Sequence, residues 1–215
     1  PVVYFLEALV LDNSFNQGSS PFPLDELIQY FSLYKGIGQK TAQRLALETI
    51  MMSEEKVTSF SESLVNTKKN IKFCKTCFYL TWDETCHICK DESRKQNTIC
   101  VVAEPKDVLS IEQSKSYRGL FHVLGGVISP LDGMYPELLR FKELVERIDT
   151  QQITEIILAL NPTVEGDTTN LYLQELLANK NVNIYKLAQG IPIGSDLAYL
   201  DEVTIDKAFE GKQKL

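Results

Sequence analysis

The apolar positions in the first third of the chain repeat with the period of an amphipathic helix. In LDELIQYFSLY, residues 24–34, they fall at Leu24, Leu27, Ile28, Phe31 and Tyr34. After a short glycine turn, the segment QKTAQRLALETIMM places four more on one side, at Ala42, Leu45, Ala46 and Ile50. A third periodic stretch, VTSFSESLVNTKKNI, runs up to a group of cysteines. The pattern predicts two helices joined by a glycine turn, followed by a third helix.

From Thr98 onward, short apolar runs alternate with longer amphipathic segments. TICVVA, FHVLGG, ITEIILAL and VNIYKLA have the length of strands, and PKDVLSIEQS, PELLRFKELVERI and TNLYLQELLANK lie between them. Alternating strands and helices are typical of a mainly parallel sheet with helices on both faces. We therefore expect an α/β fold with small appended domains.

The composition favours a soluble protein with a sizeable core. Of 215 residues, 44% are hydrophobic, yet no run of eighteen apolar residues occurs. The opening PVVYFLEALVL lacks the basic flank and small-residue cleavage pattern of a signal peptide. We expect a cytoplasmic protein without a membrane partner, and we assign no function to residues 1–20.

The net charge of −7 is unfavourable for nucleic-acid binding, but it is unevenly distributed. Residues 21–95 hold 11 Lys plus Arg against 10 Asp plus Glu, whereas residues 96–215 hold 11 against 17. A near-neutral N-terminal half is compatible with DNA contact through a local basic patch. The charge pattern does not by itself demonstrate DNA binding.

Two Cys-x2-Cys pairs stand eight residues apart, and each pair directs two thiolates at one centre. Together they predict a tetrahedral structural zinc site with the ligands Cys74, Cys77, Cys86 and Cys89. A disulfide interpretation is weaker, because cytoplasmic thiols stay reduced. A closed four-sulfur site keeps no open position for water, so hydrolytic chemistry at this metal is excluded.

The residues around these ligands receive supporting roles. We expect the positive charges of Lys72, Lys75 and Lys90 to offset the negative charge of the thiolates. His87 stands between two ligands, and we interpret it as a solvent-side or second-layer residue. Cys100, in the apolar run TICVVA, is predicted to be a buried small hydrophobe rather than a nucleophile.

The Gly-Ile-Gly turn is a candidate phosphate site. Gly36 and Gly38 permit positive φ and expose backbone N–H groups at a helix start, where a phosphate oxygen can bind. Lys40 and Arg44 are four residues apart and share a helix face, so both can reach one DNA backbone. An ordinary helical hairpin with solvated charges explains these residues equally well.

The segment LYKGIGQKTAQRLA, residues 33–46, resembles the helix-hairpin-helix of the RecR family, which is close to LPGIGPKSAQRLA. Lys35 and Gln39 stand where that family commonly has proline. HVLGGVISPLDGMYPE, residues 122–137, is similar to another stretch of the family, and its loop is shaped by Gly125, Gly126, Pro130 and Gly133. His122, which precedes this loop, is predicted to be a structural histidine rather than a base.

Residues 98–187 resemble a Toprim domain, whose catalytic members hold Mg²⁺ with a glutamate and an Asp-x-Asp pair. The glutamate is present as Glu104, but DPDREGE becomes NPTVEGD, with Asn161 and Thr163 at the aspartate positions. An amide and a hydroxyl bind Mg²⁺ poorly, so the resemblance implies a degraded site. Glu104 with Glu165 and Asp167 could retain weak Mg²⁺ binding; the alternative is a solvated loop that caps the next helix.

The C-terminal segment GIPIGSDLAYLDEVTIDKAFEG resembles the Walker B-like end of RecR proteins, which that family uses in subunit contacts. The chain contains no Gly-x4-Gly-Lys-Ser/Thr loop, so we do not expect it to hydrolyse ATP. Ser195 and Asp196 are interpreted as turn and helix-start residues. The expected division is an extension over 1–20, the hairpin region over 21–73, the zinc motif over 74–95, Toprim over 96–190 and the C-terminal segment over 191–215.

The resemblance implies a non-catalytic DNA-binding protein of recombinational repair. RecR proteins form dimers and ring-like tetramers around duplex, gapped or single-stranded DNA, and act with RecO and RecF to load recombinase. An Mg²⁺-dependent Toprim nuclease or primase-like enzyme is the alternative from another class. A zinc-stabilised interaction module without DNA affinity also remains open, and the acidic net charge favours it.

Overall fold

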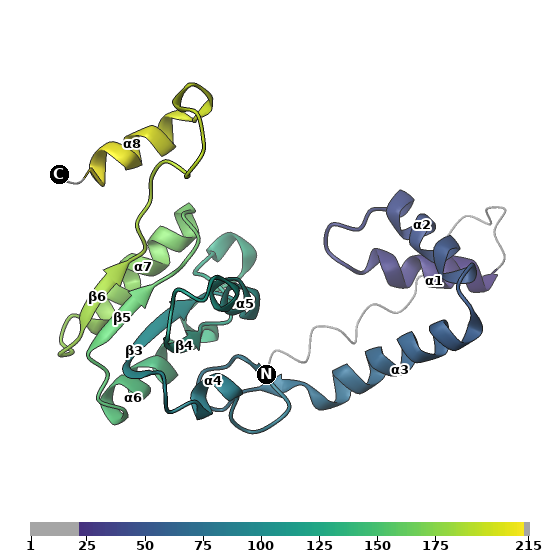
Figure 1. Ribbon diagram of the computed structural model, residues 1–215, viewed down its shortest axis with the longest axis horizontal. Coiled ribbons are helices and arrows are strands. Elements are labelled where there is room, and N and C mark those ends of the chain that lie inside the picture. The colour runs from purple at the N-terminus through teal and green to yellow at the C-terminus, as the bar shows by residue number, and fades with distance from the viewer. Residues whose placement is uncertain (1–21, 213–215) are drawn as a thin grey trace. The chain divides into compact units, whose positions relative to one another are not determined.

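The computed structural model describes residues 22–212, which divide into two compact units after Lys69. The first unit is helical, and the second is built around a parallel sheet (Figure 1). This arrangement confirms the predicted α/β fold with small appended domains. No helix in the described part of the chain is both long and apolar enough to cross a membrane.

The N-terminal unit consists of α1 (Phe22–Ser32), α2 (Gln39–Ile50) and α3 (Glu54–Asn70). Its small core joins α1 to α2 through three buried side chains, those of Ile28, Ala42 and Ala46. Two alanines on one face allow the helices to pack closely. Tyr34 lies beyond α1 and is 56% exposed, and Ile50 is 59% exposed, so each predicted apolar stripe was too long at its C-terminal end.

Four parallel strands form the sheet of the second unit: β3 (Lys95–Val102), β4 (Gly119–Val123), β5 (Glu155–Leu158) and β6 (Asn183–Lys186). Their order is β4-β3-β5-β6, which makes β4 an edge strand. The crossovers contain α5 (Pro105–Ser114), α6 (Phe141–Thr150) and α7 (Val164–Leu177). The predicted strand and helix alternation is therefore confirmed.

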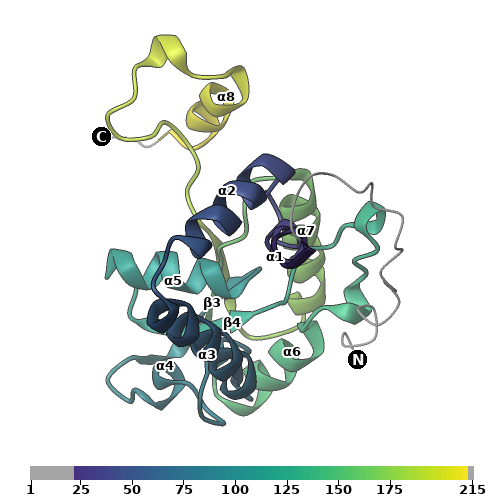
Figure 2. The ribbon, with the colours of Figure 1, turned by 90° about the vertical axis from the view of Figure 1, so that its right-hand side faces the viewer.

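Successive side chains of β3 point to opposite faces of the sheet. Ile99 and Val101 pack with residues of α6 and α7, whereas Cys100 and Val102 pack with Val108 of α5. Helices thus cover both faces, with α5 on one side and α6 and α7 on the other (Figures 1 and 2). The cysteine motif belongs to the same buried cluster as the α5 face.

The cysteine motif contains a hairpin of β1 (Lys72–Phe73) and β2 (Leu80–Thr81), followed by α4 (His87–Lys90). The loop after β4 contains two short 3-10 helices, η2 (Pro130–Asp132) and η3 (Pro136–Leu138). After β6 the chain forms η4 (Leu197–Tyr199) and α8 (Glu202–Glu210). The predicted extension over 1–20 lies outside the described residues.

Candidate metal centre and nucleic-acid interface

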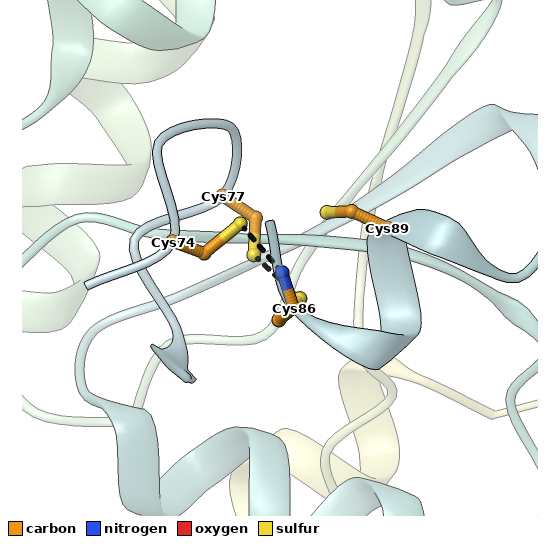
Figure 3. Close-up of side chains that lie close together, drawn as sticks. All are labelled: Cys74, Cys77, Cys86 and Cys89. Atoms are coloured by element: carbon orange, nitrogen blue, oxygen red, sulfur yellow. Dashed lines mark hydrogen bonds between the residues drawn. The ribbon is translucent and has the colours of Figure 1, made fainter. Parts of the chain in front are cut away.

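The four predicted metal ligands converge in space (Figure 3). The sulfur atoms of Cys74, Cys77, Cys86 and Cys89 all lie within 4.8 Å of one another. Cys74 and Cys77 belong to the β1–β2 hairpin, Cys86 is the N-cap of α4, and Cys89 lies within that helix. Across residues 22–212 they form the only group of three or more His, Cys, Asp or Glu side chains close enough to hold a metal ion.

The sulfur spacing fits a tetrahedral ion. A zinc site with Zn–S bonds of about 2.3 Å places its sulfurs about 3.8 Å apart. The Sγ atoms of Cys77 and Cys86 are 3.5 Å apart, and the N–H of Cys86 donates to Cys74 Sγ at 3.3 Å (Figure 3). Because three of the thiols are fully buried and the fourth is half-buried, the cluster is positioned to bind a metal ion rather than solvent.

Electrostatics within the cluster favour a cation. Hydrogen bonds from the thiols of Cys77 and Cys86 lower the pKa of Cys74, whereas the same contact raises the pKa of Cys77, which must donate its proton. Each further thiolate is therefore harder to form without a positive ion at the centre. Two of the three lysines expected to offset this charge pair with carboxylates, Lys75 with Glu84 at 2.8 Å and Lys90 with Asp83 at 2.6 Å.

Two other predicted residues near the cluster take the expected places. His87 is exposed and is not part of the ligand group, and its ring stands edge-on to Tyr79 at 6.3 Å. Cys100 is 3% exposed, and burial raises the pKa of its thiol to about 12. A thiol that stays protonated at neutral pH is a poor nucleophile, so Cys100 is a core residue, as predicted.

A contact between the metal motif and the sheet was not predicted. Phe78 follows the second ligand with a φ of +62°, and its ring meets His122 edge-on at 5.5 Å. The guanidinium of Arg140 lies 4.6 Å from the centre of the same ring. The sequence does not predict a positive φ at a phenylalanine, because the turn that brings the thiols together imposes this conformation.

His122 is the buried structural residue that we predicted. Its Nε2 lies 2.9 Å from the carbonyl oxygen of Arg140, and the side chain is fully buried. Burial, reinforced by Arg147 and Arg140, lowers the pKa of His122 to about 4. Its Nδ1 has no hydrogen-bond partner in the described part of the chain.

The glycine turn before α2 differs in one respect from the prediction. Gly36 has the expected positive φ of +84°, but Gly38 has a φ of −81° and a ψ of 167°, which is extended backbone. Gly38 is instead the N-cap of α2, and no side chain caps this helix end. The first-turn N–H groups are thus presented without a competing side-chain acceptor.

The predicted basic pair lies on the surface of α2. Lys40 and Arg44 are both exposed. Arg44 also forms an ion pair with Glu48, one turn further along, with a 3.1 Å separation. Since an exposed pair of this kind contributes little to stability, the guanidinium can exchange Glu48 for another anion at small cost.

Two of the three candidate magnesium ligands, Glu104 and Asp167, have other partners. Glu104 is the N-cap of α5 in a reciprocal capping box with Asp107, and it also pairs with Lys106 at 2.9 Å. Glu165 and Asp167 lie in the first turn of α7, where Asp167 pairs with Lys186 at 2.6 Å. Among the described residues they do not form a group of three carboxylates close enough to share a metal ion.

The NPTVEGD segment has a structural explanation. Thr163 is the N-cap of α7 and accepts from the N–H of Gly166 at 3.2 Å. The carbonyl oxygen of Asn161 occupies the space that a Cβ at Gly166 would need. This segment therefore caps the helix that follows it, which is the alternative that the sequence had left open.

The remaining predicted loop residues lie in turns. Gly125 and Gly133, in the loop after β4, have φ values of +91° and +71° and so require glycine, and Pro130 begins η2. Gly126, next to Gly125, packs against the side chains of Met134 and Leu139. Near the C-terminus, Ser195 Oγ donates to the Pro192 carbonyl at 2.6 Å, and Asp196 caps η4 by accepting from the N–H of Ala198 at 3.0 Å.

Comparisons with known proteins agree with this arrangement. Residues 24–68 match the family model "RecR, helix-hairpin-helix", residues 97–188 match "Toprim domain", and residues 190–213 match "RecR, C-terminal". The chain is 48% identical over 193 residues to the recombination protein RecR of Prochlorococcus marinus strain MIT 9515, covering 90% of this chain and 96% of that protein. It is 49% identical to that of strain MIT 9215, over the same shares of both chains. The chain therefore belongs to the RecR family of recombination proteins.

Proposed function

We propose that this protein is a non-catalytic DNA-binding protein of recombinational repair in the cytoplasm. It forms a homodimeric or tetrameric clamp on duplex, gapped or single-stranded DNA junctions, and it acts with RecO and RecF to promote recombinase loading. Zinc is the ion that we assign to the four-cysteine site. The observation that carries the DNA-binding part is the start of α2, where an uncapped helix end adjoins two exposed cations.

The physical basis of binding is a phosphate contact. The N-terminus of a helix carries partial positive charge, and its free N–H groups can donate to a phosphate oxygen. Gly38 leaves this end open, because it has no side chain to act as a cap. Lys40 and Arg44 follow on the same helix and add two full charges. Such contacts attach the protein to DNA of any sequence.

The non-catalytic part rests on the Toprim carboxylates. Phosphoryl transfer needs a divalent ion held by several oxygens at one point. Here Asn161 and Thr163 replace the two aspartates, and Glu104 caps a helix. The four-cysteine site supplies no alternative, because a metal with four thiolate ligands has no position left for water.

A salt titration tests the DNA surface. The double variant Lys40→Ala with Arg44→Ala should bind DNA more weakly at every sequence, and its log–log salt slope should fall by about 0.7 to 0.9 for each lost phosphate contact. The matched control removes two exposed lysines of the other unit, Lys142→Ala with Lys212→Ala, at the same change in net charge. Equal DNA affinity and equal salt slope in the wild type, the double variant and the control would reject this DNA-binding surface. Circular dichroism checks that all three proteins are folded.

Assembly is tested separately by mass in solution. The clamp predicts a dimer or tetramer that remains together on gapped DNA. A monomer at all concentrations, with and without gapped DNA, would reject it. Binding of RecO and RecF is tested by adding each purified partner to the protein on gapped DNA.

A further inference from the structure

The loop after β4, residues 125–139, is closed where it begins and ends. It follows Leu124 and ends before Arg140, which is the N-cap of α6. The backbone N–H of Arg140 donates to the carbonyl oxygen of Leu124 at 3.0 Å. The Nε2 of His122, on β4, lies 2.9 Å from the carbonyl oxygen of Arg140 and donates to it, because a carbonyl oxygen only accepts. These two hydrogen bonds join the two ends of the loop, and we call His122, Leu124 and Arg140 the neck.

A side chain of the cysteine motif lies against this neck. Phe78 directly follows Cys77 of the four-cysteine cluster, and its ring is edge-on to His122, with 5.5 Å between the ring centres. The guanidinium of Arg140 lies 4.6 Å from the centre of the same ring. Aromatic rings attract both the edge of another ring and a cation. The ring of Phe78 therefore contacts one residue from each side of the neck and helps to keep them together.

The backbone of Phe78 is held in an unfavourable conformation. Its φ of +62° lies in the left-handed region, which a phenylalanine adopts only where the surrounding structure imposes it. The turn imposes it through two hydrogen bonds. The N–H of Phe78 donates to the carbonyl oxygen of Cys74 at 3.0 Å, and the N–H of Cys74 donates to that of Tyr79 at 2.7 Å. If this turn relaxes, φ returns to a negative value and the ring moves away from the neck.

A metal ion would fix this turn in place. Cys74 and Cys77 lie on the turn, whereas Cys86 is the N-cap of α4 and Cys89 lies within that helix (Figure 3). An ion bound by all four sulfurs ties the turn to α4 through metal–ligand bonds. Metal binding contributes directly to the folding free energy of small motifs of this kind, so loss of the ion relaxes the turn.

The interior of the loop is connected to the neck through Met134. Ser129 and Met134 exchange two backbone hydrogen bonds of 2.9 Å each. The methyl carbon of Met134 and the side chain of Leu139 both lie against Gly126, where a Cβ would meet them at 3.0 and 3.4 Å. Gly126 and Leu139 are within two residues of the neck along the chain. A movement at the neck therefore reaches the methyl group of Met134.

We propose that metal binding by the four cysteines sets the conformation of the loop 125–139, and that Phe78 is the positioning residue that transmits it. With the ion bound, the ring lies against His122 and Arg140, and the neck is closed. Without the ion, the ring leaves, the two hydrogen bonds of the neck open, and the loop samples several conformations. The proposal rests on the proposed metal binding and is independent of the DNA surface.

The conformation of this loop matters for the surface of the sheet unit. Three of its apolar side chains are exposed, those of Leu131, Tyr135 and Leu138. Closing or opening the neck therefore changes how these apolar groups are presented to other molecules.

The methionine methyl groups provide a test with internal controls. Met134 lies in the loop, and the other two methionines, Met51 and Met52, follow α2 in the N-terminal unit. In the full chain labelled with ¹³C at the methionine methyl groups, removal of zinc by a chelator should shift or split the Met134 signal and leave Met51 and Met52 unchanged. Elemental analysis verifies the removal. An unchanged Met134 signal would overturn the proposal, and so would equal changes at all three methionines, because the effect would not be confined to the loop.

A variant that keeps all four cysteines isolates the ring. Alanine is also strained at a positive φ, so Phe78→Ala removes the ring without relieving the backbone. This variant should bind as much zinc as the wild type, yet its Met134 signal should move toward that of the metal-free wild type. The matched control, Phe73→Ala, removes a 57% exposed ring from the same hairpin and should leave Met134 unchanged. A zinc-loaded Phe78→Ala protein with the wild-type Met134 signal would overturn the role of Phe78.

Hydrogen exchange at the neck gives the second measurement. The amide of Arg140 should exchange on the order of tenfold faster in zinc-loaded Phe78→Ala than in Phe73→Ala, because aromatic contacts of this kind are worth about a factor of ten in an equilibrium constant. The amide of Ala159, which donates to the carbonyl oxygen of Val101 within the sheet, should exchange equally in both. Equal exchange at Arg140 would overturn the role of the ring. Protein that takes up no zinc would reject the metal assignment and with it the metal control of the loop, whereas the two phenylalanine variants would still test the ring at the neck.

Discussion

The backbone N–H of Val123 donates a hydrogen bond of 2.8 Å to the carbonyl oxygen of Cys77. Val123 is the last residue of the edge strand β4, and Cys77 belongs to the four-cysteine cluster that could hold a metal ion. The cysteine motif therefore satisfies a donor at a sheet edge that would otherwise be open to pairing with another chain. The metal site and the sheet are joined through backbone and share one buried cluster.

Metal content and sheet protection should change together. We expect about one zinc per chain in protein purified without chelator. Metal removal, or Cys86→Ser, should loosen the turn around Cys77 and increase hydrogen exchange at Val123 more than at the amides of β5, which lies between β3 and β6. Elemental analysis that finds no zinc, or equal exchange at both strands before and after removal, would contradict this coupling.

The two turn glycines should respond differently to alanine. At Gly36, where φ is +84°, alanine is strained and should lower the free energy of unfolding by about 1 to 3 kcal/mol. At Gly38, φ is −81° and a Cβ would meet no atom within 4 Å. Alanine at this position should therefore change the free energy of unfolding by less than about 0.5 kcal/mol. Urea denaturation of both variants measures the difference.

Gly38→Ala also isolates the role of the open helix end. A methyl group beside the first-turn N–H groups should hinder phosphate approach, so DNA affinity should fall although stability is kept. A Gly38→Ala variant with wild-type DNA affinity would show that phosphate does not approach the backbone at this point.

Stability should decrease as the pH falls below neutral because of His122. Burial lowers the pKa of His122 from 6.5 to about 4, so between these values the unfolded chain binds a proton that the folded chain does not. The contribution of His122 to the free energy of unfolding is therefore present above pH 6.5 and is lost as the pH falls toward 4, with a loss of about 2 kcal/mol at pH 5. His122→Gln should flatten this dependence of stability on pH. Because both proteins carry the same cysteines, the titration of the thiols does not account for a difference between them. If ¹⁵N chemical shifts showed that the imidazole of His122 is protonated in the folded protein at pH 5.5, this explanation of the pH dependence would be ruled out.

The Toprim region should be inactive with divalent ions. Glu104 and Asp167 are held by Lys106 and Lys186, and the described carboxylates form no shared site. Purified protein should therefore show no nuclease, topoisomerase or primase activity with Mg²⁺ or Mn²⁺. Activity that disappears in Glu104→Gln would favour the enzyme alternative instead.

The local features of this protein could be predicted from the sequence because they depend on residues near one another in the chain. Helical spacing located α1 and α2, and the apolar runs after Thr98 located the four parallel strands. The two Cys-x2-Cys pairs identified the ligand group, since each pair forms its own turn. NPTVEGD showed the loss of the aspartates without any knowledge of the fold.

Contacts between distant residues were decided by the tertiary structure. Glycine tolerates both signs of φ, so only the packed hairpin determined that Gly36 is left-handed and Gly38 extended. The separation of Glu104 from Glu165 and Asp167 depends on how α5 and α7 cross the sheet, and spacing along the chain does not encode it. The bond from Val123 to Cys77 likewise exists because the sheet places its edge strand beside the metal turn, 46 residues away along the chain.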